Sequence, residues 1–488
     1  MKNSVSFLFR QSFKYNYLQN ILSKFISLIF SVFVARILFI DDFGHILIAN
    51  AISSGVRVFS DIGLTNYYFQ KIIRNEKQKN EILCITTFYS FIVYSFATLI
   101  QIIIGYIAIF YGNDIVGNLL FIYSAGTFLS IPISIHGVIL KKDFKYKTIS
   151  ISRFFKDIVA SFSKFFLASF GFGVFSIAIG DIIGKAVNFS ILSISTKYYP
   201  SKSDFNNKYS KDVIFFGKHG LLIGIAGYIS SHFDKLFFSF YFPVSQLGLI
   251  NFGIQYGSLI DQTILMPQRS LINSLYISIK DNFIDLRNMV LAFYRLTIIF
   301  VSPIITILYL NAEVLVNLIF GDKWLLAVPF LRLYLINSML ASIIFSANGL
   351  LSSLGHPEII SRIKLIRLPF LITILFIAKY NEMTLFQIVS IYIISNFLLM
   401  IPQFLISIYK IELSVVAYIN VLYKQIFGII ICAITVLYIR TLELFENIYL
   451  TLFTEISLFI LLYILWVILC FGNKIKDDIN DIFFNERS

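Results

Sequence analysis

LCITTFYSFIVYSFATLIQIIIGYIAIF, residues 83–110, is a mostly apolar run without a single Asp, Glu, Lys or Arg. A helix needs about 20 mostly apolar residues to cross the hydrocarbon core of a bilayer, and this run is longer than that. Its polar and apolar side chains do not alternate with the period of two that a membrane-spanning strand requires. The stretch therefore predicts a transmembrane helix.

The composition of the whole chain agrees with this stretch. Of the 488 residues, 58% are hydrophobic and only 14% are charged. Soluble domains carry about 45–50% apolar and about 25% charged residues. No long polar stretch is present that could fold as a soluble domain. The composition therefore excludes a soluble protein and predicts an integral membrane protein.

The same length criterion, applied along the chain, predicts about fourteen transmembrane helices in an all-α, polytopic membrane protein. Strands are not expected. The predicted spans are residues 18–40, 44–67, 83–110, 115–139, 149–170, 172–195, 213–234, 244–268, 289–311, 325–351, 359–379, 384–408, 415–439 and 447–470.

The charges of the loops predict the orientation. Basic side chains gather at the N-terminus and in the 71–81, 141–147 and 197–211 loops, whereas the alternate connections carry acidic residues such as Asp42 and Asp114. Lys and Arg are enriched in cytoplasmic loops. We therefore expect both termini in the cytoplasm.

A weak internal repeat predicts the domain organisation. A shift of 204 residues places residues 39–52 over residues 243–256, and Gly44 then falls on Gly248. An even number of helices per repeat starts both copies on the same side of the membrane, as in parallel-repeat transporters. We expect two six-helix lobes in a pseudo-two-fold arrangement and an appended helix pair. The predicted ranges are 1–200 and 201–410 for the lobes, 411–472 for the appended helix pair and 473–488 for a cytoplasmic tail.

Ionisable side chains inside the predicted spans are the candidates for function. Each costs about 2.5–3.5 kcal/mol at the centre of a membrane helix, so it needs a partner or a watery cavity. The candidate substrate-binding residues are Lys24, Arg57, Lys156, Lys164 and Lys235. The candidate ion-coupling residues are Asp61, Asp261 and Asp234.

A purely structural role for some of these charges stays open. Arg57–Asp61, Arg153–Asp157 and Asp181–Lys185 are spaced i, i+4 and could neutralise each other as ion pairs.

Four lysines have no evident local partner, and for them a cavity is favoured: Lys24, Lys156, Lys164 and Lys235. A cavity rich in Lys and Arg suits an anionic solute, and a diphosphate in particular, because ammonium and guanidinium groups bind phosphate oxygens directly.

No catalytic or cofactor motif is present. The sequence contains no phosphate-binding loop of the Walker type, no GxSxG and no HExxH. Its cysteines, Cys84, Cys432 and Cys470, lack the spacing of a metal site. We therefore expect no enzymatic activity, no cofactor and no metal.

Three stretches in order resemble the Wzx-type polysaccharide exporters, and their colanic-acid-exporter branch in particular. The first contains ARIL (35–38), DDFG (41–44) and DIGL (61–64). The second is LKKDFKYKTISISR (140–153) followed by GFGVFSIAIGDIIGK (171–185). The third is FDKLFFSFYFPVSQLGLINFG (233–253), continued by MPQRS and IFGDKW. The resemblance covers about residues 10–400.

The resemblance implies a function. Such proteins belong to the MOP superfamily, which also holds the lipid II flippases and the MATE multidrug extruders. They flip an undecaprenyl-diphosphate-linked oligosaccharide repeat unit across the cytoplasmic membrane by a rocking of two lobes coupled to an ion gradient. The product is O-antigen, capsule or exopolysaccharide. The expected partners are this lipid-linked substrate, membrane lipids, H⁺ or Na⁺, and further polysaccharide-assembly proteins, but no nucleic acid.

Two other classes of protein stay open. A cation-coupled drug antiporter of the MATE group would use carboxylates in its cavity. The aspartates that keep this alternative in view are Asp61, Asp157, Asp181, Asp234 and Asp261. A membrane enzyme such as an O-antigen polymerase would need a long periplasmic loop or an acidic catalytic motif at the membrane edge. The sequence shows neither.

Overall fold

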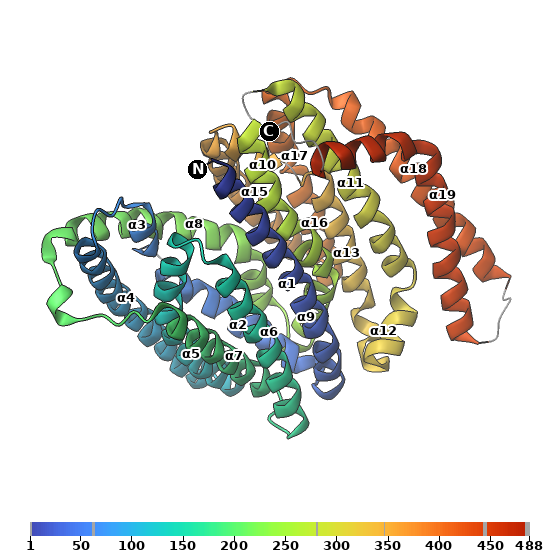
Figure 1. The fold of residues 1–488 in the computed structure, drawn as a ribbon. Coiled ribbons are helices and arrows are strands. Elements are labelled where there is room, and N and C mark those ends of the chain that lie inside the picture. The colour runs from blue at the N-terminus through green and yellow to red at the C-terminus, as the bar shows by residue number, and fades with distance from the viewer. Residues whose placement is uncertain (1, 61–63, 280–281, 346, 443–446, 484–488) are drawn as a thin grey trace. The chain divides into compact units, whose positions relative to one another are not determined.

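The computed structural model of the chain describes residues 2–60, 64–279, 282–345, 347–442 and 447–483. Within these ranges the regular structure is helical and no strand is present (Figure 1). The predicted all-α class is thereby confirmed. The contacts between residues divide the chain into two compact units, unit 1 (residues 1–251) and unit 2 (residues 252–488).

Unit 1 contains eight α-helices, two short 3₁₀ turns and the first part of a ninth α-helix within the described residues. They are α1 (Lys2–Ile37), α2 (Ile40–Ser60), α3 (Leu64–Gln70), α4 (Glu76–Phe110), α5 (Asp114–Lys142), α6 (Tyr146–Ser169), α7 (Phe175–Thr196), η1 (Lys202–Asp204), η2 (Asn207–Tyr209), α8 (Ser210–Tyr241) and α9 (Val244–Gly257).

Small residues let the helices of unit 1 pack closely. The helices α4, α5 and α7 run side by side (Figure 1). A Cβ on Gly117 would lie 2.6 Å from the carbonyl oxygen of Gly105, so these two glycines allow α4 and α5 to touch backbone to backbone. Such small-residue contacts are typical of membrane helices, where van der Waals packing replaces the hydrophobic effect.

A buried glutamine ties three helices of unit 1 together. The Gln101 side chain on α4 is completely buried. Its amide nitrogen donates to the Ser53 hydroxyl on α2 at 2.9 Å, and its carbonyl oxygen accepts from the Thr127 hydroxyl on α5 at 2.9 Å. Because no water is available in the apolar interior, these polar groups satisfy one another.

Unit 2 contains the rest of α9 and the following described elements. They are η3, a π-helical turn (Asp261–Leu265), α10 (Met266–Ile279), α11 (Phe283–Leu310), α12 (Ala312–Phe320), η4 (Asp322–Ala327), α13 (Val328–Ile343), α14 (Ala347–Ser353), α15 (Pro357–Tyr380), α16 (Leu385–Leu398), α17 (Ile401–Lys410), α18 (Val415–Thr441) and α19 (Ile448–Phe483).

A second buried glutamine attaches the last two helices of unit 2 to α11. Gln425 on α18 donates to the Ser302 hydroxyl on α11 at 2.9 Å and to the Tyr463 hydroxyl on α19. The Tyr463 hydroxyl in turn donates to the carbonyl oxygen of Ile299 at 2.8 Å. The pair α18 and α19 therefore packs on α11 through polar contacts as well as apolar ones.

The final turns of α19 also pack on unit 2. Asp478 forms an ion pair with Arg295 of α11, with 2.6 Å between carboxylate oxygen and guanidinium nitrogen. Each side chain is only 11% exposed. The acidic stretch that begins at Asp477 is therefore anchored at Asp478.

Nine helical stretches within the described residues are long and apolar enough to cross a membrane. The other predicted spans are helical as well, but they fall on α2, α6, α8, α9 with α10, and α15, which are richer in charge or shorter. The multi-pass character of the protein is clear. The count of about fourteen spans stays a prediction, as does the division into lobes at residue 200.

Candidate substrate-binding site

Helices α6 and α7 approach each other closely through a pair of glycines. A Cβ on Gly180 would lie 2.5 Å from Cγ of Lys164, and one on Gly184 would lie 2.7 Å from the carbonyl oxygen of Lys156. This G-x-x-x-G spacing places two small residues on one face of α7. The side chains of α6 therefore lie directly over α7.

The close approach of α6 and α7 brings Lys164 to Asp181. Lys164 Nζ lies 2.6 Å from Asp181 Oδ1. The pairing of Asp181 with Lys185 that the i, i+4 spacing left open is not formed. Lys185 Nζ instead donates to the carbonyl oxygen of Gly126 on α5 at 2.8 Å.

A second ion pair lies further along α6. Lys156 Nζ is 3.0 Å from Asp157 Oδ1, so Asp157 pairs with its neighbour in sequence and not with Arg153, the partner that the i, i+4 spacing left open. Lys156 therefore has a local partner that the sequence analysis did not assign, whereas the carboxylate that pairs with Lys164 comes from another helix. All four charged groups are partly exposed.

Lys24 on α1 belongs to the same group of charges. Helix α1 packs along α6, where the hydroxyl of Ser161 donates to that of Ser27 at 2.9 Å. Lys24 is half-buried and lies within electrostatic reach of Lys156, Asp157 and Lys164.

Arg57 on α2 joins this group through α7. It lies within electrostatic reach of Lys185, and its guanidinium donates to the Ser54 hydroxyl one turn earlier at 2.8 Å. Lys185, which was not among the candidates, is therefore part of the group. Its position four residues after Asp181 indicates an ion pair along the helix as readily as a place in this group, so the sequence alone does not single it out.

Helix α8 adds Lys235 to this group. The Tyr228 hydroxyl donates to the carbonyl oxygen of Ala51 on α2 at 2.7 Å, and the rings of Tyr228 and His232 stack with centroids 5.1 Å apart. His232 lies within electrostatic reach of both Lys235 and Arg57.

We call this group the unit 1 charge cluster. Cations outnumber carboxylates in it. Its members are Lys24, Arg57, Lys156, Lys164, Lys185 and Lys235, with Asp157 and Asp181.

The structure describes two of the three candidate ion-coupling residues. Asp61 lies outside the described residues. Asp234 on α8 is only 7% exposed, and its Oδ1 atom has no hydrogen-bond partner among the described residues. Asp261 lies in unit 2 at the start of the π-helical turn, 3.0 Å from the guanidinium of Arg269.

No set of side chains in the described part of the chain could hold a metal ion. The three cysteines are free thiols. The chemistry that unit 1 offers is therefore electrostatic: positive charge on helices α1, α2, α6, α7 and α8.

Solved structures show which class of protein has this fold. The lipid II flippase MurJ in an inward closed conformation aligns over 96% of this chain and 99% of its own, with 15% identity and a TM-score of 0.67. An inward-facing multidrug resistance MATE family transporter of the MOP superfamily aligns over 82% of this chain and 94% of its own, with 16% identity and a TM-score of 0.57. The chain therefore has the fold of this flippase and this transporter.

The chain belongs to the polysaccharide biosynthesis protein family, whose model matches residues 33–329. This agrees with the family resemblance of the three sequence stretches. A comparison with curated protein sequences gives no match.

Proposed function

We propose that this protein flips undecaprenyl-diphosphate-linked oligosaccharide repeat units across the bacterial cytoplasmic membrane by alternating access. The family and the fold support transport of a lipid-linked substrate in polysaccharide biosynthesis. The observation that carries the proposal is the unit 1 charge cluster. Several cations on neighbouring membrane helices are costly unless an anion or water compensates them.

The diphosphate of the carrier lipid is the anion that these cations would bind. The Arg57 guanidinium can donate two parallel hydrogen bonds to phosphate oxygens, whereas Lys24 and Lys235 act as compact positive charges. The lysines of the two ion pairs, Lys156 and Lys164, already have carboxylate partners. A diphosphate would therefore compete with Asp157 and Asp181 for them.

Coupling to an H⁺ or Na⁺ gradient is part of the proposal, with Asp234, Asp61 and Asp261 as candidates. Asp234 has the strongest support, because a buried carboxyl oxygen without a donor is costly and is stabilised by a proton or a bound cation. Asp261 already has Arg269 as its partner. An Asp234→Asn variant that transports normally after both gradients have collapsed would remove Asp234 from this role.

A drug antiporter of the MATE group is less well supported. Such a transporter would present free, accessible carboxylates to a cationic drug. Asp157 and Asp181 are each paired with a lysine, and Asp234, whose Oδ1 has no hydrogen-bond partner among the described residues, is buried. The cations that remain favour an anionic substrate.

The proposal is tested by the output of surface polysaccharide in a strain that lacks its own copy of the gene. Lys24→Gln, Arg57→Gln and Lys235→Gln should each lower the output, and Arg57→Lys should be intermediate because it keeps the charge but loses the two-pronged donor. Lys145→Gln removes an exposed lysine outside the cluster and is the matched control. Protein level is checked by blot. Normal output from a variant that combines Lys24→Gln, Arg57→Gln and Lys235→Gln would refute the proposal.

A further inference from the structure

A separate pocket lies inside unit 1, between helices α3, α4, α5, α6 and α7. Its volume is about 420 Å³, within the range of about 300–1,000 Å³ that small-ligand sites occupy. No residue of the unit 1 charge cluster is among the described residues that line it. It is therefore a different place in the fold from the site proposed above.

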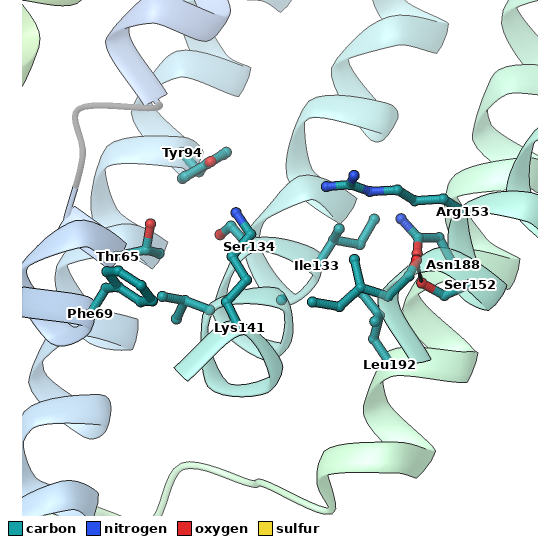
Figure 2. A pocket seen from close by; sticks show the side chains of 13 residues that line it. Thr65, Phe69, Tyr94, Ile133, Ser134, Lys141, Ser152, Arg153, Asn188 and Leu192 are labelled. Atoms are coloured by element: carbon teal, nitrogen blue, oxygen red, sulfur yellow. Dashed lines mark hydrogen bonds between the residues drawn. The ribbon is translucent and has the colours of Figure 1, made fainter. Parts of the chain in front are cut away.

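Two basic side chains line the pocket. Arg153 of α6 and Lys141 of α5 both line it, and no Asp or Glu is among its described lining residues. Figure 2 shows Arg153 and Asn188 on one side of the pocket, Thr65 and Phe69 on the opposite side and Lys141 between them. Among the described residues no carboxylate lies within ion-pair distance of Arg153, because Asp157 pairs with Lys156.

A buried amide provides the second observation. Asn188 of α7 is only 8% exposed, and its Oδ1 atom has no hydrogen-bond partner among the described residues. Buried polar atoms are nearly always satisfied, so an orphan beside a pocket indicates a missing partner. Oδ1 is an acceptor and needs a donor. A ligand that carries a hydroxyl group as well as negative charge would suit Asn188 together with Arg153 and Lys141.

The apolar part of the pocket restricts the ligand further. Phe69 and Leu192 line it beside the polar groups. A small inorganic anion would leave these side chains facing water, whereas the glycerol and upper acyl region of a phospholipid would cover them. Lys141 also begins the basic 141–147 loop, which the charge pattern predicts to be cytoplasmic. Basic pockets between membrane helices on the cytoplasmic side bind anionic head groups.

We infer that this pocket is a phosphate-binding site for the head group of an anionic phospholipid. Arg153 donates paired hydrogen bonds to the phosphate, Lys141 adds a second positive charge, and Asn188 Oδ1 accepts from a head-group hydroxyl. The inference does not depend on what the protein transports.

The test measures binding to the purified full-length protein in neutral detergent. Native mass spectrometry follows retention of phosphatidylglycerol, with phosphatidylcholine as the neutral comparison. Thermal unfolding with and without inorganic phosphate tests whether the pocket binds a soluble phosphate instead of a lipid head group. The variants are Arg153→Gln and Asn188→Asp. The second keeps the size of the side chain but places a negative charge against the ligand. Lys145→Gln is the control, because it removes a lysine of the 141–147 loop that does not line the pocket.

We expect the wild type and Lys145→Gln to retain phosphatidylglycerol over phosphatidylcholine, and both pocket variants to lose about tenfold or more in affinity. A second outcome is that the wild type shows no preference between the two lipids but is stabilised by inorganic phosphate, and that Arg153→Gln abolishes this stabilisation. The pocket would then still be a phosphate-binding site, but its ligand would be a soluble phosphate and not a lipid head group. The inference is overturned if the wild type responds to neither probe. It is equally overturned if both variants, eluting as single symmetric species, bind like the wild type.

Discussion

Gly44 of α2 and Gly248 of α9 lie against each other's helices in a reciprocal contact. A Cβ on Gly44 would overlap the carbonyl oxygen of Val244, and a Cβ on Gly248 would overlap the carbonyl oxygen of Ile40. The shift of 204 residues that relates the two glycines also relates Ile40 to Val244. Two helices related by a two-fold axis make this kind of contact, in which each copy presents the same surface.

Replacing either glycine with alanine should destabilise the protein. The atoms in the way belong to the backbone and cannot rotate aside, so Gly44→Ala or Gly248→Ala should cost about 1–3 kcal/mol. Thermal unfolding in detergent, followed by fluorescence-detected size exclusion, measures the loss. Gly227→Ala is the control, because a Cβ on this helical glycine meets nothing within 4 Å. Unfolding of all three variants at the wild-type temperature would show that the helices do not cross here.

Lys142 should stabilise the end of α3. Its Nζ atom donates to the carbonyl oxygens of Tyr68 at 2.6 Å and Lys71 at 2.7 Å, and it lies 4.6 Å from the centre of the Tyr68 ring. Lys142→Met leaves these carbonyls without a donor and should cost about 1.5–3 kcal/mol. Lys145→Met removes the same charge from the same loop but should cost little, because Lys145 is exposed. Equal unfolding temperatures for the two variants would contradict this role.

The helices could be predicted from the sequence, but the partners of the charges could not. Apolar runs such as residues 83–110 have one stable form in a bilayer, so their length predicts the helix, here α4. The partner of Asp181 depends instead on how closely α6 and α7 approach. Gly180 and Gly184 decide that distance, and the sequence does not say which helix they face. The pairing of Asp181 with Lys164 was missed for this reason.

Ionic anchoring of α19 should be measurable as coupling between Arg295 and Asp478. Removing one partner of a buried ion pair costs about 3–5 kcal/mol, because the other charge is left uncompensated. Arg295→Met and Asp478→Asn should each destabilise strongly, and the double variant should lose much less than the sum of the two. The exposed pair Lys79–Glu76 is the control, for which the coupling should be about 0–1 kcal/mol. Additive losses for Arg295 and Asp478 would show that the contact is not formed.

The predicted topology places the 197–211 loop in the cytoplasm. With Cys84, Cys432 and Cys470 replaced by serine, a single cysteine at the exposed position Ser203 should react with an impermeant maleimide only after the membrane is opened. A cysteine at Asp114, in a connection predicted to be periplasmic, should react in intact cells. Labelling of position 203 in intact cells would show that the protein has the opposite orientation to the one that the loop charges predict.

The central claim is that the unit 1 charge cluster binds the diphosphate of a carrier lipid. The most direct measurement is the affinity of the purified protein for undecaprenyl diphosphate. It is compared between the wild type, a triple variant that combines Lys24→Gln, Arg57→Gln and Lys235→Gln, and the single variant Arg153→Gln, which tests the separate pocket. We predict that the triple variant binds at least about tenfold more weakly than the wild type, whereas Arg153→Gln binds normally. Wild-type affinity in a well-folded triple variant would contradict the account.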